Sequence, residues 1–114
     1  MFRAYGDDYL QLNEEKLRSS FILHHGKITA PWQAQRLTDI KNDDIAVFID
    51  SPPEVLLIGS GRITAFPNAD VMQALDQAHI GFECMDSRAA ARTYNILIGE
   101  GRDVSVAMLL PNVR

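Results

Sequence analysis

The alternation of apolar and polar residues changes along the chain and divides it into two parts. Over about residues 8–32 the pattern is typical of extended strands, with a loose alternation at Tyr9–Leu12 and a longer run at Lys16–His25. Gly26-Lys27 separates this run from Ile28–Ala30, and a glycine at the first central position suits a two-residue type II′ hairpin turn. The first part therefore predicts a three-stranded antiparallel β meander over 8–32.

The second part, residues 42–110, alternates between helical and strand periodicity. Asn42 can cap a short helix with the apolar stripe Ile45, Phe48 and Ile49, and Pro52 and Pro53 follow it. After this helix we expect a strand at 55–58, a helix at 69–78, a strand at 82–85, a helix at 87–98 and a strand at 104–110. Such an order predicts parallel strands joined by right-handed crossovers. The expected fold is α/β: one compact domain over 1–114, with a mostly parallel, mixed central sheet, helices, and the meander as an extra layer.

The predicted helix at 87–98 is apolar around most of its circumference. Ala90, Ala91, Tyr94 and Leu97 lie on one broad side, and Ile96 lies well around the cylinder. Such a helix needs cover on more than one face. Either it is a central helix packed between the sheet and the meander, or another protein chain covers part of it, Tyr94 included.

Composition narrows the class of protein. The 114 residues suffice for one domain with a core of its own, and the 11 basic and 15 acidic residues give a net charge of −4. This balance argues against a nucleic-acid partner. The longest apolar run, Val55–Ile58, is too short to span a bilayer, and Asp7 and Asp8 stand where a targeting leader would be basic. We expect a cytoplasmic protein that is not integral to a membrane.

Two loops are expected to meet at one edge of the sheet. Gly59-Ser60-Gly61 and Met85-Asp86-Ser87 each follow a predicted parallel strand, and the carboxyl edge of such strands is the usual ligand crevice. Glycine lets backbone N–H groups approach an anion closely, the helix start after Ser87 offers further donors, and Arg92 supplies a positive charge. A dinucleotide or nucleotide triphosphate site is not expected, because Thr64 replaces the third glycine of the dinucleotide fingerprint and no Gly-Lys-Ser/Thr motif is present. A tight turn explains the same glycines without any ligand.

No catalytic or metal-binding set emerges from the remaining polar residues. Arg92, Glu100, Arg102 and Asp103 are close in sequence, and they suit an ion-pair and capping network at a helix end. On a strand, His24 and His25 face opposite ways and cannot chelate one metal ion together. Cys84 falls in a predicted strand and is interpreted as a buried, inert thiol. We therefore expect no metal and no cofactor, and the absence of a catalytic set argues against an enzyme without deciding the question.

The chain from Pro53 onward resembles a known family. The residues that carry the resemblance are Pro53–Gly61, Pro67, Gly81, Glu83–Ser87, Arg92-Thr93-Tyr94-Asn95 and Glu100-Gly101-Arg102. They are similar to a small α/β domain family of formerly unknown function that includes the mitochondrial complex I (NADH:ubiquinone oxidoreductase) assembly factor three. The resemblance implies a mostly parallel sheet with an extra β layer, in a cytoplasmic bacterial relative of a non-enzymatic assembly factor. Ser87 departs from the family's frequent Thr, and Ala91 stands at a position often held by Cys.

Two functions remain open at this stage. The leading hypothesis is a non-enzymatic protein-interaction or assembly module with another protein as partner. The alternative is a domain, or an enzyme, that binds a small anionic metabolite in the crevice at Gly59–Gly61 and Met85–Ser87. The candidate ligand or interaction surface consists of Gly59, Ser60, Gly61, Met85, Asp86, Ser87, Arg92, Tyr94, Asn95, Glu100 and Arg102.

Overall fold

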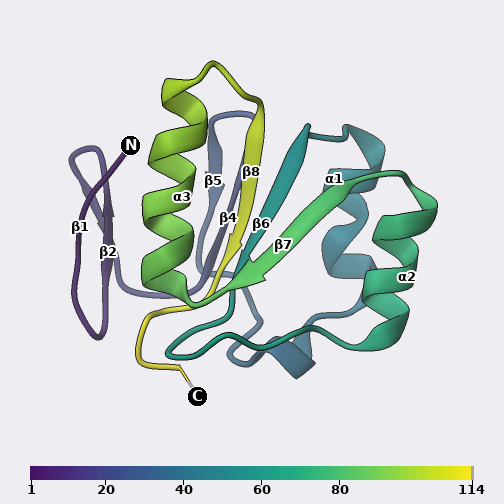
Figure 1. Cartoon of the computed structure of the whole chain (residues 1–114). Coiled ribbons are helices and arrows are strands. Elements are labelled where there is room, and N and C mark those ends of the chain that lie inside the picture. Colours follow the sequence, from purple (N-terminus) through teal and green to yellow (C-terminus); the bar gives the residue numbers. More distant parts are fainter. Residues whose placement is uncertain (114) are drawn as a thin grey trace.

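A five-stranded mixed sheet forms the centre of the molecule in the computed structural model, which describes residues 1–113 (Figure 1). Its strand order is β5-β4-β8-β6-β7. The strands are β4 (Phe21–His24), β5 (Lys27–Thr29), β6 (Val55–Gly59), β7 (Gly81–Met85) and β8 (Val104–Met108). β6 pairs in parallel with both β7 and β8, whereas β4 is antiparallel to β8 and β5. The predicted parallel alignment of the last three strands is therefore confirmed.

Helices cover both faces of this sheet. The chain leaves β6 for β7 through α2 (Ala69–Gln77) and then crosses back over β6 to β8 through α3 (Ser87–Gly99). Because the two crossovers run in opposite directions and both are right-handed, the helices lie on opposite faces. Leu56 and Ile58 pack in the core on the α2 side, and Leu57 packs in the core on the α3 side. Cover on both faces explains why the 55–58 segment is continuously apolar.

The short helix before β6 starts differently from the prediction. Two 3-10 turns, Leu37–Asp39 and Asn42–Ile45, lead into α1 (Ala46–Asp50). Asn42 lies inside the second turn and is not its cap, since the carboxylate of Asp44 accepts a hydrogen bond from the backbone N–H of Lys41 at 2.8 Å. Ile45 and Phe48 are buried as expected, while Ile49 is exposed.

The N-terminal β layer is built from other strands than predicted. It consists of β1 (Phe2–Tyr5), β2 (Leu10–Leu12) and β3 (Glu15–Leu17), in an antiparallel order β1-β2-β3. The chain then leaves this layer, and β4 and β5 join the central sheet. The boundary of 8–32 was wrong because all four residues of β4 are buried, and a strand covered on both faces belongs inside the central sheet, where it pairs with β8.

The hairpin turn between β4 and β5 lies one residue earlier than predicted. His24 pairs with Lys27, so the turn residues are His25 and Gly26, with φ angles of 47° and 77°. Positive φ at both positions defines a type I′ turn, not type II′. Because His25 belongs to the turn, its ring lies with its centroid 4.0 Å from that of His24, and the expectation that the two rings face opposite ways was wrong.

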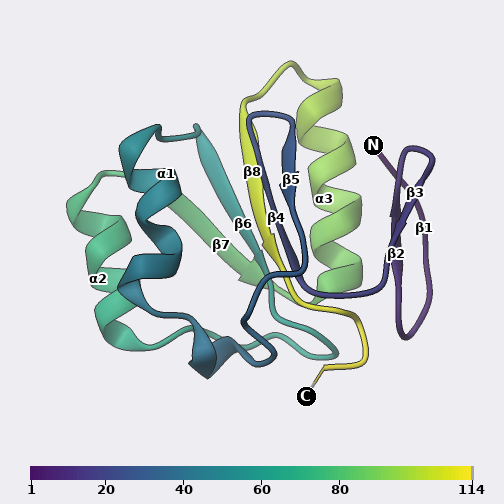
Figure 2. The same cartoon turned by 180° about the vertical axis from the view of Figure 1, so that it is seen from behind.

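α3 is an internal layer of the molecule. Viewed in Figures 1 and 2, the small sheet, α3, the central sheet and the pair α1 and α2 follow one another across the fold. Ala90 and Ala91 of α3 share one buried cluster with Phe2, Leu10 and Leu17 of the small sheet. The many-sided apolar character of this helix is therefore explained by cover from its own chain on two faces.

One asparagine holds the small sheet to α3. The side-chain oxygen of Asn95 accepts a hydrogen bond from the backbone N–H of Phe2, and its Nδ2 donates to the carbonyl of Phe2, both at 2.7 Å. We expect Asn95→Ala to lower the free energy of unfolding by about 1–2 kcal/mol, because two partly buried hydrogen bonds are lost. Urea unfolding measures this change, with Gln73→Ala on the exposed side of α2 as control. Equal unfolding midpoints for the two variants would contradict the role of Asn95.

Candidate functional site

The two loops predicted to meet do meet at the carboxyl edge of β6 and β7. The backbone N–H of Ser60 donates to the carbonyl of Met85 at 2.8 Å, and the N–H of Ser87 donates to the carbonyl of Gly61, also at 2.8 Å. Asp86 caps α3, since its side chain accepts a hydrogen bond from the N–H of Ala89 at 3.0 Å. Six of the predicted site residues therefore share one small region of the fold: Gly59, Ser60, Gly61, Met85, Asp86 and Ser87.

The hydroxyl group of Ser87 connects three segments at this edge. Its Oγ accepts a hydrogen bond from the N–H of Gly61 at 2.8 Å and donates one to the carbonyl of Leu109 at 2.6 Å. Ser87 is fully buried, so both bonds are made without competition from water. The N–H groups of the glycine turn are consequently engaged within the chain itself.

Both glycines are required by close approach of other parts of the chain. A Cβ at Gly59 would collide with the sulfur of Met108, and a Cβ at Gly61 would collide with the carbonyl oxygen of Val113. Gly61 also has a φ of +102°, which side chains rarely adopt. The glycine turn thus lets the segment after β8 fold back onto it, where the N–H of Arg62 donates to the carbonyl of Val113 at 2.7 Å.

The opening at this edge lies one residue beyond each predicted loop. A pocket of about 460 Å³ is lined by Asp7, Arg62, Arg88, Pro111 and Asn112. Arg62 directly follows Gly61, and Arg88 directly follows Ser87. Neither arginine was predicted as a site residue, although each stands beside a predicted loop, because the outer walls of the pocket come from the turn after β1 and the segment after β8.

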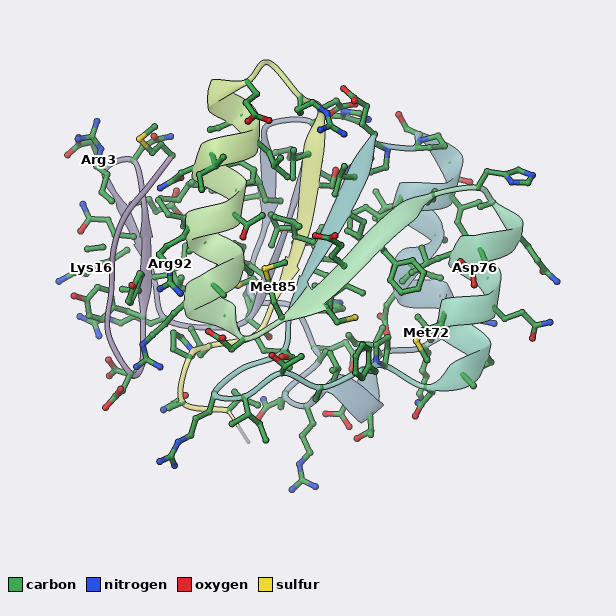
Figure 3. The ribbon with its side chains drawn as sticks, in the orientation of Figure 1. Arg3, Lys16, Met72, Asp76, Met85 and Arg92 are labelled. Carbon is green, nitrogen blue, oxygen red and sulfur yellow. The ribbon has the colours of Figure 1, made fainter. Side chains whose placement is uncertain are left out.

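The middle of α3 is directed toward the small sheet. Nη1 of Arg92 donates to the hydroxyl of Tyr5 at 2.8 Å, and the ring of Tyr94 meets that of Phe2 edge-on with centroids 5.3 Å apart. Figure 3 shows Arg92 on this side of α3, whereas Met85 ends the neighbouring strand. Arg92, Tyr94 and Asn95 are therefore contact residues between two layers of the fold.

Glu100 and Arg102 lie at the other end of α3, about 18 Å along the helix from Ser87. Nε of Arg102 donates to Glu54 at 2.8 Å, and the second oxygen of Glu54 accepts from the backbone N–H of Asp103 at 3.1 Å. Both hydrogen bonds lower the pKa of Glu54. The bond from the backbone N–H of Asp103 has the larger effect, and the bond from Arg102 has the next largest. The expected ion pair thus involves Glu54, which precedes β6 and was not predicted, and it does not include Arg92.

Cys84 is half-buried in β7 and packs against the core on the α2 side. Burial raises the pKa of its thiol to about 11. The interpretation as an unreactive thiol therefore has a physical cause, because only the thiolate is a strong nucleophile.

The pH dependence of thiol modification tests this environment. We expect the iodoacetamide alkylation rate of Cys84 to rise about tenfold per pH unit between pH 8 and pH 10, since the thiolate fraction rises so below the pKa. Mass spectrometry of the intact chain follows the reaction, with glutathione as a freely accessible reference thiol. A rate that levels off below pH 10 would contradict the raised pKa.

A second prediction concerns Ser87. We expect Ser87→Ala to lower the free energy of unfolding by about 2–4 kcal/mol, because it leaves a buried N–H donor at Gly61 and a buried carbonyl at Leu109 without partners. Ser19→Ala removes the same hydroxyl group from a half-buried site in the loop before β4 and serves as control. Chemical denaturation compares the two, and similar small losses would show that the Ser87 hydroxyl does not hold the edge together.

The fold and its carboxyl edge define a class of protein: a small α/β domain with a mixed sheet, in which a second antiparallel sheet covers α3. The chain belongs to the family described as Protein of unknown function (DUF498/DUF598), whose model matches residues 2–109. The resemblance noted in the sequence was to a family of formerly unknown function that includes the mitochondrial complex I assembly factor three. That expectation is confirmed, because assembly factor 3 proteins are among the relatives of the chain.

Three of the known proteins that this chain resembles in sequence or structure show the range of the similarity. A crystal structure from Bordetella parapertussis is 38% identical, covers 96% of this chain and 93% of its own, and has a TM-score of 0.85. The "13 kDa major membrane protein" of Francisella tularensis is 25% identical over 108 residues, which cover 84% of this chain and 88% of that protein. The human NADH dehydrogenase (ubiquinone) 1 alpha subcomplex assembly factor 3 is 30% identical over 82 residues, or 70% of this chain.

Two differences separate this chain from these relatives. The matched part is only 45% of the human assembly factor, so this chain spans less than half the length of that relative. The membrane protein of Francisella tularensis is named for its location, but among residues 1–113 of this chain no helix combines the length and apolar character needed to cross a bilayer.

Proposed function

We propose that this chain is a non-enzymatic protein-binding module that helps a larger complex, such as a respiratory complex, to assemble. The proposal is supported by the 30% identity to proteins whose name describes assembly of an NADH dehydrogenase subcomplex. Because the similarity covers less than half of those proteins, the partner and the complex belong to the proposal.

The observation that carries the proposal is a pair of exposed apolar side chains between β6 and α2. Ile63 is 66% exposed and Phe66 is 62% exposed. Exposed large apolar residues are unremarkable when single, but Ile63 and Phe66 stand within four residues of one loop. We take the two together as an apolar patch suited to a protein partner. We propose this loop as the interface in place of the surface beside Tyr94 that the sequence suggested, because Phe2 of the same chain packs against the Tyr94 ring.

The backbone under this patch is held in place. The hydroxyl of Ser60 donates to the carbonyl of Ile63 at 2.6 Å and accepts from the N–H of Ala65 at 3.2 Å. Ser60 itself is buried and tied to Met85 of the next strand. An ordered loop loses less conformational entropy on binding than a free one, so this arrangement favours recognition by a protein surface.

Substitution of the patch tests the assembly role. We expect the double variant Ile63→Ser, Phe66→Ser to co-purify with about tenfold less of the respiratory-complex subunits than the wild type does. The reason is that apolar contacts at the centre of an interface dominate affinity. The matched control is Ile96→Ser on α3, because Ile96 is also 62% exposed. Quantitative mass spectrometry after chemical cross-linking in cells measures retention for the three proteins.

Two results would contradict the proposal. One is that the wild-type chain retains no subunit of any respiratory complex. The other is that the double variant and Ile96→Ser retain the same subunits in equal amounts. Thermal unfolding of each variant shows that a loss of partners does not come from a loss of fold.

The cellular location is part of the same proposal. We propose that the chain works in the cytoplasm, where subunits of a membrane complex are available before they are incorporated. Cell fractionation tests this location: recovery in the soluble fraction after a high-salt wash of the membranes supports it, and retention in the washed membranes contradicts it.

A further inference from the structure

We propose that the pocket between Arg62 and Arg88 binds a small molecule through a phosphate or carboxylate group held by both guanidinium groups. This binding is independent of the proposed assembly role, because it uses other side chains than the Ile63 and Phe66 patch. It differs from the crevice expected at the glycine turn, whose N–H groups are engaged within the chain.

The pocket is built from four segments that are distant in sequence. Its walls come from the turn after β1, the loop after β6, the start of α3 and the segment after β8, in the form of Asp7, Arg62, Arg88 and Pro111-Asn112. The backbone at both arginines is fixed. The N–H of Arg62 donates a hydrogen bond to the carbonyl of Val113, and Ser87, which precedes Arg88, is fully buried. Guanidinium groups that start from fixed backbone positions lose less freedom when they bind a ligand.

The charge balance within the pocket favours an anion. Two guanidinium groups and a single carboxylate line it, in a chain whose overall net charge is −4. Arg62 takes part in no ion pair among residues 1–113, so its charge is not neutralised within that part of the chain. Guanidinium forks match the geometry of carboxylate and phosphate oxygens, which are therefore the expected ligand groups.

Arg88 is held ready by its neighbours. Its Nη2 donates to a carboxylate oxygen of Asp7 at 2.7 Å, and its guanidinium carbon lies 5.9 Å from the centre of the Tyr5 ring. The side chain of Arg88 is 32% exposed, whereas that of Asp7 is 85% exposed. Asp7 is therefore a weakly held counter-ion, which an incoming anion can replace at little cost.

The size of the pocket indicates more than a bare ion. Its volume of about 460 Å³ lies in the range of about 300–1,000 Å³ that small-molecule sites occupy. The buried ring of Pro111 offers an apolar wall, and Asn112 offers an amide. The ligand class is thus a small organic phosphate or carboxylate whose charged group lies between the two arginines.

Titration of the full chain with inorganic phosphate, and separately with malonate, tests this site. Two-dimensional NMR of backbone amides is recorded at constant ionic strength, adjusted with sodium chloride, so that general screening does not change. We expect saturable shifts at Arg62 and Arg88 with at least one of the two probes. The stronger response identifies the ligand group as phosphate or carboxylate.

Matched variants separate a site from general attraction of anions. Arg62→Gln and Arg88→Gln should each weaken binding by about tenfold, since each removes one charged fork. The control Arg3→Gln removes the same charge from the far end of the small sheet, where Figure 3 shows Arg3, and should bind as the wild type does. Asp7→Asn should tighten binding several-fold, while Asp8→Asn, one residue along the same turn, should not.

Each outcome decides the proposal. Saturable binding that is weakened about tenfold in Arg62→Gln and unchanged in Arg3→Gln supports it. Arg62→Gln is informative because this exposed side chain makes no ion pair among residues 1–113. Shifts that never saturate with either probe overturn it. Equal binding by Arg62→Gln, Arg88→Gln and Arg3→Gln also overturns it. The amide spectra without ligand establish that every variant is folded.

Discussion

The arrangement of the carboxyl edge depends on the buried hydroxyl of Ser87. Through one donated and one accepted hydrogen bond it connects the glycine turn after β6, the start of α3 and the end of β8. A single small polar group can do this because it is fully buried, where both bonds are protected from exchange with water. Three segments that the sequence keeps far apart are thereby fixed relative to one another.

Two surface features follow from this fixed edge. The loop that carries Ile63 and Phe66 begins at Gly61, and its backbone is held by Ser60. Arg62 and Arg88 each stand one residue beyond a hydrogen-bonded position, so their side chains leave the edge from defined points. The apolar patch and the basic pocket are therefore adjacent, because Arg62 and Ile63 are consecutive residues of one loop. Each is proposed to bind a different kind of ligand.

Much of the fold was predictable from the periodicity of the apolar residues. The continuous run Val55–Ile58 indicated a strand buried on both faces, and the helix at 87–98 indicated cover on more than one face, because burial acts directly on the apolar pattern. The strands of the first third were less predictable. The separation of β3 from β4 within Lys16–His25 depends on pairing of β4 with β8, more than 80 residues away, and such contacts leave little local signal.

The candidate site was also predictable only in part. That Gly59–Gly61 and Met85–Ser87 would meet followed from the parallel order of the strands. Arg92 was expected at this edge, yet it lies about 6 Å further along α3 than Arg88 and contacts Tyr5 of a strand that was not predicted. The pocket itself depends on the segment after β8, which folds back against Gly61 at Val113. The sequence of that segment does not indicate this tertiary contact.

Native-state hydrogen exchange tests most directly whether the Ser87 linkage fixes the edge. The amides of Gly61, Arg62 and Leu109 donate to Ser87 Oγ, Val113 and Gly59 respectively. If the edge is a cooperative part of the core, these three amides exchange only by global unfolding, as slowly as the amides of β6. Fast exchange of all three while β6 stays protected would show that the edge opens on its own and that Ser87 does not fix it.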